Sequence, residues 1–538
     1  MIPIVNHGLQ IQPRGAFMAT NQQTRVALVF AAMEEPGFKP ATVSNAEHLG
    51  LAYLAGALRE QQIDVTIING ELEGLTSETV VSRLVTQRFD LIGFSPVSLS
   101  MKRTLAIVSH IRERLPGTVI VLGGHLASMC AADIMAAEAS VDMILAGDAE
   151  FTFPMLINAI TGSTALDEVP GLYWREGAAI RKSATPPPMM DIDLLPRPAR
   201  DGLAFLKSHG NLQGARILAS RGCVYNCSFC TTPNFYGRSI RFRAPECVIR
   251  EMDDLSAEYG IRHFWFNDDL FVNGSTKNTK WIESFAALLR TRNFTFRVLC
   301  RADSFREKNR HVLGLLKEAG LVHVFLGLES GSPGALAVYN KLTTVEKNRE
   351  AVFLMKGAGI AVQIGFIMFN PYSTPEELIE NARFLYDIGE LYRFFPLTLA
   401  MSAFPGTPIV DRLIGDGLMD RLDYRRPLHC FRYMDKAVAK LVNIMHGVYE
   451  REHELDAHIL RSLGYDGRNT GGAIRQELQN INLRYFEDLV DAVTAGEEAS
   501  SERIIESWPT DIARCLKSAW LAFPQQRALT NCTAEVVS

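Results

Sequence analysis

The sequence lacks the features that mark membrane and secreted proteins. The segment Ile360–Phe369 is among its most apolar stretches. Gln363 interrupts it, and it falls well short of the roughly 20 apolar residues that a membrane helix needs. The start of the chain, MIPIVNHGLQIQPRGAF, does not place an apolar run after a charged one, so no signal peptide is predicted. We therefore expect a cytoplasmic protein without a membrane span.

Neither sign of charge is in large excess. The 538 residues include 55 basic and 60 acidic side chains, which gives a net charge of −5, and no basic run occurs. We therefore expect no nucleic-acid partner. A hydrophobic fraction of 47% argues against a disordered or collagen-like chain. The length suggests about three domains.

Cysteine is scarce, and its count of nine is odd. Without a signal peptide, this does not indicate a disulfide framework. Six cysteines are isolated and are interpreted as buried or free thiols with no further role. They are Cys130, Cys247, Cys300, Cys430, Cys515 and Cys532. The other three fall within eight residues, 223–230, and require a separate explanation.

The first part of the chain alternates short apolar runs with helical patterns. Strands are predicted over Arg25–Phe30, Ile63–Ile68, Leu91–Phe94, Val119–Leu122 and Val141–Leu145. Helical spacing appears over His48–Gln61 and Lys102–Arg114. This order predicts a doubly wound, Rossmann-like parallel sheet with a ligand at the carboxyl ends of its strands. No Gly-x-Gly-x-x-Gly follows the first strand, where Phe30–Pro36 stands, so a dinucleotide is disfavoured.

A hairpin predicted over 171–181 is followed by a proline-rich stretch, Ser183–Arg200, which we interpret as an extended linker. The strand and helix alternation then resumes. Strands are predicted over Arg216–Ser220, His263–Phe266, Thr295–Leu299, His323–Leu328, Val362–Phe369 and Pro396–Met401. Six such units suit a partial (β/α)6 barrel of the TIM type, with chemistry at the carboxyl ends of the strands.

Beyond the barrel the pattern becomes helical, most clearly over Lys436–Arg451 and Ile474–Ala495. The predicted α/β organisation is therefore a Rossmann-like domain over 1–182, a linker over 183–211, a barrel over 212–423 and a helical region over 424–538.

Three cysteines follow the first barrel strand, in Ser220–Thr231, with the spacing Cys-x3-Cys-x2-Cys. Thiolates are the usual ligands of iron–sulfur clusters. Three of them would leave one iron of a four-iron cluster without a protein ligand, as in a reactive rather than a structural site. Two alternatives are a zinc site and three unrelated buried thiols. Structural zinc usually needs a fourth ligand, however, and a turn beside a strand end is an odd place for three structural thiols. The spacing favours the cluster.

This motif, with Phe229 before its last cysteine, resembles the signature of the radical S-adenosylmethionine (SAM) superfamily, and the resemblance spans roughly 214–418. It implies a 4Fe–4S cluster on Cys223, Cys227 and Cys230, with SAM on the open iron. The cluster would cleave SAM reductively to methionine and a 5′-deoxyadenosyl radical, which abstracts hydrogen from carbon. An external one-electron reductant such as flavodoxin or ferredoxin is implied as a partner.

The resemblance also implies a set of SAM-binding residues. They are Phe229 in the signature, Asp268 near the amino group, Arg301 near the carboxylate, Glu329 and Ser330 near the ribose and amino acid, and Ile364 near the adenine. Asp268 and its neighbour Asp269 could instead be turn formers. Met368–Thr374 departs from the Gly-Phe-Pro-Gly-Glu-Thr run that family members often have, which leaves the adenine contacts open.

The first domain resembles that of the cobalamin-binding radical SAM subfamily. The matching segments are Glu47–Gly56, Gly93–Pro96, Gly123–Ser128 and Ala146–Glu150. The implied cobalamin-binding residues are Ser95, Ser98, Gly123, Gly124, His125 and Ser128. The Asp-x-His-x-x-Gly element that supplies a cobalt ligand elsewhere is absent. We therefore expect His125 to lie at the corrin periphery or at the nucleotide tail, with a purely structural role as the alternative. For the domain as a whole, the alternative is a Rossmann-like sheet that binds another nucleotide or no ligand.

Together these patterns predict a cobalamin-dependent radical SAM methyltransferase acting on an unactivated carbon, or on phosphorus, of a small biosynthetic molecule. A peptide substrate is not excluded. One alternative keeps both cofactors but performs a cyclisation, oxidation, rearrangement or transfer of another SAM fragment. Another is a non-enzymatic iron–sulfur redox sensor, against which the missing fourth cysteine speaks. No catalytic acid or base is assigned.

Overall fold

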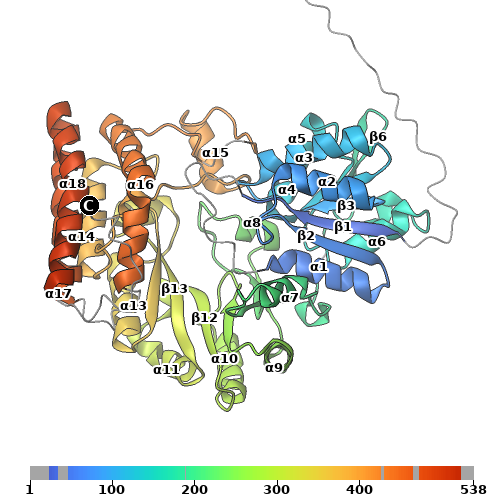
Figure 1. The fold of residues 1–538 in the computed structure, drawn as a ribbon, viewed down its shortest axis with the longest axis horizontal. Coiled ribbons are helices and arrows are strands. Elements are labelled where there is room, and N and C mark those ends of the chain that lie inside the picture. Colours follow the sequence, from blue (N-terminus) through green and yellow to red (C-terminus); the bar gives the residue numbers. More distant parts are fainter. Residues whose placement is uncertain (1–23, 34–46, 188, 426–428, 464–471, 523–538) are drawn as a thin grey trace, which may run out of the picture.

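The computed structural model describes residues 24–33, 47–187, 189–425, 429–463 and 472–522. The predictions for the first 17 residues, Glu34–Pro36 and Cys532 lie outside these ranges. The described chain forms an α/β part, a second α/β part and a group of long helices, arranged in chain order from one end of the molecule to the other (Figure 1).

A seven-stranded sheet forms the first part, with the order β2-β1-β3-β4-β5-β6-β7. Its strands are β1 (Arg25–Phe30), β2 (Asp64–Asn69), β3 (Leu91–Phe94), β4 (Val119–Gly123), β5 (Met143–Leu145), β6 (Leu172–Glu176) and β7 (Ala179–Lys182). The first five pair in parallel, and the hairpin β6–β7 continues the sheet in antiparallel pairing. The predicted doubly wound sheet and its hairpin are confirmed.

Successive residues of the interior strand β1 enter two different apolar cores. Ala27 and Val29 pack on one face, under helices α2–α5, and Val26 and Leu28 pack on the other, under α1 and α6. The bounds of these helices are α1 Leu49–Glu60, α2 Ser77–Gln87, α3 Met101–Arg114, α4 Gly124–Met129, α5 Ala131–Ala137 and α6 Thr152–Ile160. Burial on both faces explains why the parallel strands read as apolar runs rather than alternating patterns.

The proline-rich segment leads from the first part to the second along helix α1. The backbone N–H of Ala199 donates to the Ala52 carbonyl at 2.8 Å, and a Cβ at Gly56 would lie 2.0 Å from the Arg197 carbonyl oxygen. A short 3₁₀ turn, Ile192–Leu194, and helix α7 (Asp201–Ser208) interrupt it. The segment is therefore extended but packed closely on the first domain.

The second part contains a parallel sheet of five strands, with the order β14-β13-β12-β11-β8. These strands are β8 (Ala215–Ile217), β11 (His263–Phe266), β12 (Thr295–Arg301), β13 (Leu321–Glu329) and β14 (Ala361–Phe366). Helices α9 (Pro245–Tyr259), α10 (Thr276–Leu289), α11 (Arg310–Glu318), α12 (Pro333–Val338), α13 (Val345–Gly357) and α14 (Pro375–Asp387) accompany the sheet. The open barrel architecture agrees with the predicted fold class.

Two of the predicted barrel strands differ from the structure. The segment Pro396–Met401 is not a strand, because Phe395–Thr398 forms a 3₁₀ turn around a proline that cannot donate to a ladder. A single parallel bridge, Phe369 to Ala400, remains there. The prediction Arg216–Ser220 spans two elements: the barrel strand β8, and β9 (Ser220–Gly222), which pairs in antiparallel fashion with β10 (Ile240–Phe242).

Three long helices complete the described chain: α16 (Lys436–Leu463), α17 (Gly472–Ala495) and α18 (Glu498–Ala522). They lie at the far end of the molecule from the first domain, where α17 runs beside α14 and α18 (Figure 1). The two predicted C-terminal helices are confirmed, and both are longer than predicted. None of the helices in the described ranges is long and apolar enough to cross a bilayer.

A return contact joins the chain after the barrel to the first domain. Helix α15 (Pro408–Gly415) is followed by a segment whose Arg421 pairs with Asp133 at 2.7 Å. In the same segment, the Tyr424 hydroxyl donates to Glu138 at 2.9 Å and Arg425 also pairs with Glu138. Both acceptors belong to α5 or its C-cap. The charged turn that begins the predicted helical region thus binds the first domain.

Candidate functional site

The three clustered cysteines lie in the loop between β9 and helix α8 (Thr232–Tyr236). Gly222 begins this loop with φ +92°, and a Cβ there would lie 2.3 Å from the Ser239 carbonyl oxygen. Only glycine is compatible with both conditions. The loop therefore leaves β9 in a direction that other residues would not permit.

The three cysteines of this loop are free thiols. Cys227 is buried, whereas Cys223 and Cys230 are half-buried. Burial raises the pKa of Cys223 to about 11, and the neighbouring thiols of Cys230 and Cys227 add to this. No three Cys, His, Asp or Glu side chains in the described ranges are arranged to hold a single metal ion. That arrangement does not support the zinc alternative, and it is compatible with a cluster, whose ligands lie farther apart than those of one ion.

Arg301, at the end of β12, brings a positive charge to the cysteine loop. Its Nη1 donates to the Cys227 Sγ at 3.2 Å, and its guanidinium lies 3.7 Å from the centre of the Tyr225 ring. Asp303 accepts from its Nε at 2.8 Å. The predicted SAM-binding arginine therefore contacts a cluster thiol directly, a contact that spacing alone did not indicate.

The side chains of the two aspartates that follow β11 accept hydrogen bonds from different partners. Asp268 is fully buried, and its carboxylate accepts from the Ala219 N–H at 3.2 Å and from the Ser220 hydroxyl. Both oxygens are thus engaged in fixing the β8–β9 junction. Asp269 instead accepts from the Gly222 N–H at 3.1 Å. These long-range bonds give Asp268 a structural role in joining two segments of the chain, and its contact with SAM stays a prediction.

Glu329 ends β13 in the left-handed region, with φ +67°, and pairs with Lys341 at 2.7 Å. Gly327 makes room for this pair, since a Cβ there would lie 2.7 Å from the Glu329 Oε1 and 3.2 Å from the Lys341 Nζ. Lys341 also accepts from Arg301 through its carbonyl oxygen. The pair thus links Glu329 to Arg301. Lys341 was not singled out from the sequence.

The remaining predicted SAM residues have apolar or internal surroundings. Ser330 is fully buried, and its hydroxyl donates to Asn381 at 2.7 Å, so a direct contact of this hydroxyl with SAM is not supported. Phe229 packs edge-on against Tyr339, with ring centres 5.6 Å apart. Ile364 is half-buried on β14.

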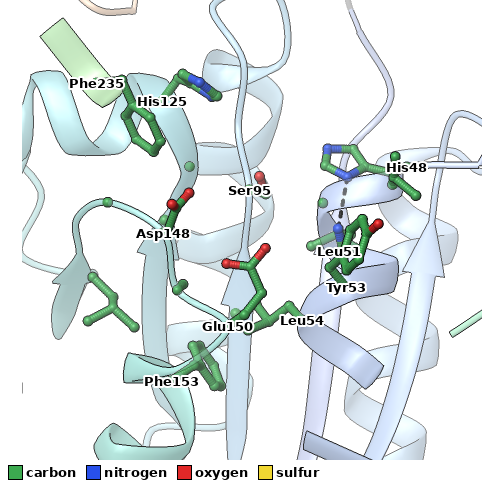
Figure 2. A pocket seen from close by; sticks show the side chains of 18 of the residues that line it. His48, Leu51, Tyr53, Leu54, Ser95, His125, Asp148, Glu150, Phe153 and Phe235 are labelled. Carbon is green, nitrogen blue, oxygen red and sulfur yellow. Dashed lines mark hydrogen bonds between the residues drawn. The ribbon is translucent and has the colours of Figure 1, made fainter. Parts of the chain in front are cut away.

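A cavity of about 310 Å³ lies between the carboxyl edge of the first sheet and the start of the second domain (Figure 2). Its deep lining is apolar and includes Leu51, Leu54 and Phe153. Its polar lining includes His48, Ser95, His125, Asp148 and Glu150 (Figure 2). From the second domain it is lined by Leu218, Ser220, Arg221, Phe235, Tyr236, Asn267 and Asp269. Both domains therefore build one cavity.

Four of the six predicted cobalamin residues line this cavity: Ser95, Gly123, Gly124 and His125. Gly124 has φ +82°, and a Cβ there would lie 2.8 Å from the Ser95 Oγ. The His125 ring stacks on Phe235 at 3.9 Å between ring centres, and burial lowers its pKa. The bare glycine turn and the flat aromatic wall suit a large planar ligand that approaches the backbone closely.

The other two predicted serines do not line the cavity. Ser128 donates to the Gly124 carbonyl at 2.7 Å and accepts from the Gly147 N–H at 3.1 Å, so it ties two of the cavity's turns together from behind. Ser98 is half-buried just before α3. Ser128 lies in α4, one turn after the glycine pair, and both of its hydrogen bonds are made within the first domain. A direct contact between Ser128 and cobalamin is therefore not supported.

Comparisons with known proteins agree with this geometry. Residues 42–157 match the B12 binding domain, and residues 217–385 match the radical SAM superfamily. These ranges contain the glycine turn of the cavity and the three clustered cysteines. The chain is a cobalamin-binding radical SAM enzyme.

Relatives of this radical SAM enzyme carry different named activities. An uncharacterized methyltransferase of Pyrococcus horikoshii is 28% identical over 396 residues, which cover 73% of this chain and 84% of the relative. The anaerobic magnesium-protoporphyrin IX monomethyl ester cyclase of Cereibacter sphaeroides is 26% identical over 345 residues, covering 63% of this chain and 56% of the relative. The chain thus spans little more than half of that cyclase.

The fold of the radical SAM enzyme also matches a solved structure. It is the cobalamin-dependent SAM radical enzyme OxsB with aqua-cobalamin and SAM bound. The TM-score is 0.71 at 20% identity, with 96% of this chain and 82% of OxsB covered. This likeness confirms the predicted fold class. The matches to the B12 binding domain and to the radical SAM superfamily confirm the predicted cofactors, which are cobalamin, SAM and a 4Fe–4S cluster.

Buried ion pairs join the two cofactor-binding domains of the enzyme at the cavity. Arg221 of β9 pairs with Asp148 at 2.9 Å and with Glu150, and Arg241 of β10 pairs with Asp148 at 2.9 Å. At most 15% of any of these four side chains is exposed. Arg221 is two residues from Cys223, so these pairs fix the cysteine loop against the turn that follows β5. Sequence reasoning singled out Ala146–Glu150 but not its arginine partners.

Proposed function

We propose that this enzyme transfers a methyl group to a carbon or phosphorus atom of a small molecule. The observation that carries the proposal is the shared cavity. The glycine turn at Gly123 and Gly124 forms one side, and Arg221 and Phe235, which flank the clustered cysteines, form the other. Residues of both cofactor-binding domains thus line one cavity. The methyltransferase relative supports the same reaction class.

We propose that each group of cavity and loop residues has a separate task. Cys223, Cys227 and Cys230 hold the cluster, while Arg301, Glu329, Phe229 and Ile364 surround SAM. Ser95, Gly123, Gly124 and His125 contact cobalamin. When bound, the cluster supplies an electron that cleaves SAM to a 5′-deoxyadenosyl radical, and cobalamin carries the methyl group.

The contributions of the chain itself are positioning and the exclusion of water. Arg301 holds a positive charge against the Cys227 sulfur, which favours the reduced, more negative cluster. Lys341 fixes the carboxylate of Glu329. The rings of Phe235 and Tyr236 and the side chain of Arg221 line the cavity on the side of the second domain and keep water from that part of its wall. Exclusion of water protects a radical from side reactions.

We further propose that an external one-electron donor reduces the cluster and that the enzyme works in the cytoplasm. The eight cysteines of the described ranges are all free thiols, as expected in a reducing compartment. Each reductive cleavage of SAM would oxidise the cluster, so the external donor would have to return one electron to the cluster for each radical formed. Reduction by flavodoxin or ferredoxin can be compared directly with reduction by dithionite.

Anaerobic reconstitution tests the cofactor assignments. The purified chain should take up about four iron and four sulfide per molecule, as a 4Fe–4S cluster requires. The Cys227→Ser variant should not. A Cys430→Ser variant is the matched control, because that cysteine is exposed and lies outside the motif. Equal iron content in all three proteins would refute the assignment of the cysteines.

A labelled methyl group tests the reaction. Enzyme loaded with cob(I)alamin and given SAM with a trideuterated methyl group should yield S-adenosylhomocysteine and trideuterated methylcobalamin. A specific alternative comes from the cyclase relative: radical chemistry without methyl transfer. In that case reduced enzyme would release 5′-deoxyadenosine but form no S-adenosylhomocysteine, which would overturn the methyl-transfer proposal.

A further inference from the structure

A second histidine, His48, lines the cavity. It lies in the segment Glu47–Gly56 but is not among the predicted cobalamin-binding residues. His48 is the N-cap of α1, and its Nδ1 accepts a hydrogen bond from the Leu51 N–H at 3.1 Å. Its ring rests on Phe30, with ring centres 4.7 Å apart, and Gly50 leaves room for it, since a Cβ there would lie 3.3 Å from Cε1. The bond to Leu51 and the contact with Phe30 therefore fix the orientation of the ring.

These contacts decide which nitrogen of His48 carries the proton. Burial lowers the pKa of the imidazole to about 4, and the positive charge of Arg216 adds to this, so the ring is neutral near pH 7. A neutral imidazole has one N–H, and the nitrogen that accepts a hydrogen bond cannot carry it. Because Nδ1 accepts from Leu51, the proton lies on Nε2.

The protonated Nε2 faces the cavity. Figure 2 shows the dashed bond from one ring nitrogen of His48 to Leu51, while the other nitrogen is directed into the space between Ser95 and His125. Within the described ranges, no hydrogen bond of Nε2 is formed. His48 is half-buried, so Nε2 stays accessible to a ligand in the cavity. A corrinoid that displaces water from this donor has to offer an acceptor oxygen in its place, because a donor left without a partner would cost free energy.

We propose that His48 donates a hydrogen bond to the corrinoid bound in this cavity and is not a ligand of its cobalt. Coordination needs a lone pair on Nε2, which would require the proton to move to Nδ1 and would break the cap of α1. The acceptor on the ligand is an oxygen, either of a side-chain amide of the corrin ring or of the phosphate in the nucleotide tail. This inference rests on the cobalamin site described above.

Two substitutions separate the two nitrogens. Asparagine retains an acceptor near the position of Nδ1 and is a strong N-cap, but its amide is too short to reach the position of Nε2. Glutamine places an amide N–H near the position of Nε2 and is a poor cap. His48→Asn should therefore leave the melting temperature of the apoprotein unchanged and weaken corrinoid binding. His48→Gln should lower the melting temperature and retain binding. His446→Asn, at an exposed site on α16, is the matched control.

Affinity for cob(II)alamin can be measured by absorbance titration under anaerobic conditions. The loss of one hydrogen bond predicts a Kd about tenfold higher for His48→Asn. Repeating the titration with cob(II)inamide, which lacks the phosphate and base of the tail, distinguishes the acceptors. A loss with both ligands assigns a corrin amide, and a loss with cobalamin alone assigns the phosphate. If His48→Asn binds both as tightly as the wild type does, the inference is wrong.

Electron paramagnetic resonance tests the second half of the inference. Cob(II)inamide has no base of its own, so any nitrogen superhyperfine splitting must come from the protein. We expect no splitting that depends on His48. A splitting in the wild type that disappears in His48→Asn would show cobalt ligation and refute the inference. If the wild type binds neither corrinoid, the cobalamin site itself fails, which is a distinguishable result.

Discussion

Replacement of Arg221 by methionine should loosen the contact between the two cofactor-binding domains. The arginine forms ion pairs with Asp148 and Glu150, and all three side chains are at least nine-tenths buried. Methionine fills a similar volume without a charge. Asp148 retains Arg241 as a partner at 2.9 Å, whereas no other ion pair of Glu150 is found in the described ranges. The substitution therefore leaves Glu150 as an uncompensated buried carboxylate.

The expected cost follows from that unpaired charge. Removal of one partner from a buried ion pair typically costs about 3–5 kcal/mol. For a domain of this size, about 2–4 °C of melting temperature corresponds to each kcal/mol, so we expect a decrease of roughly 10 °C. The matched control is Arg25→Met, because the Arg25–Asp64 pair is about half-exposed and should contribute at most about 1 kcal/mol.

Thermal denaturation of the apoprotein, followed by circular dichroism, measures this difference. Adding Glu150→Gln should restore most of the melting temperature. If the single variant melts within about 2 °C of the wild type, the ion pairs do not stabilise the domain contact and the reasoning fails.

Three further predictions concern the cysteine loop. Arg301→Gln removes the positive charge beside the Cys227 sulfur, so the reduction potential of the cluster should fall by roughly 60 mV or more. An EPR-monitored redox titration measures this potential. An unchanged potential would contradict a contact between Arg301 and the cluster ligand Cys227. Burial raises the pKa of Asp268 to about 7, so the wild type should lose up to about 3 kcal/mol of stability as the pH rises from 5 to 8. In urea unfolding, the stability of Asp268→Asn should depend less on pH. If wild type and variant lose stability in parallel, the assignment of this pH dependence to Asp268 is wrong. Gly222→Ala would place a Cβ 2.3 Å from the Ser239 carbonyl oxygen and should lower the iron content after reconstitution. The control is Gly274→Ala, because a Cβ at that position meets no other atom. Equal iron content in the two variants would refute the steric argument.

Features set by local sequence were predicted well. The cysteine motif is contiguous, and buried strands such as β11 (His263–Phe266) and β1 (Arg25–Phe30) appear as short apolar runs with the predicted bounds. The β-branched and aromatic residues of such runs favour strands wherever they are buried. The glycine pair Gly123–Gly124, which the family resemblance implied as part of the cobalamin site, lines the cavity.

Features set by distant contacts were not predictable. Which of two adjacent aspartates faces inward depends on the hydroxyl of Ser220, 48 positions from Asp268. Arg221 is 73 positions from Asp148, and the chain offers 55 basic and 60 acidic side chains as candidate partners. The segment Pro396–Met401 has the composition of a strand, yet the proline turn leaves only one bridge to Phe369.

The return contact of Arg421 and Arg425 with helix α5 has a consequence for how turnover can proceed. The first domain is tethered by the proline-rich segment on one side and held by this contact on the other. Two connections of this kind, added to the buried ion pairs of Arg221, leave the first domain less freedom to rotate than a carrier domain on a single flexible tether has.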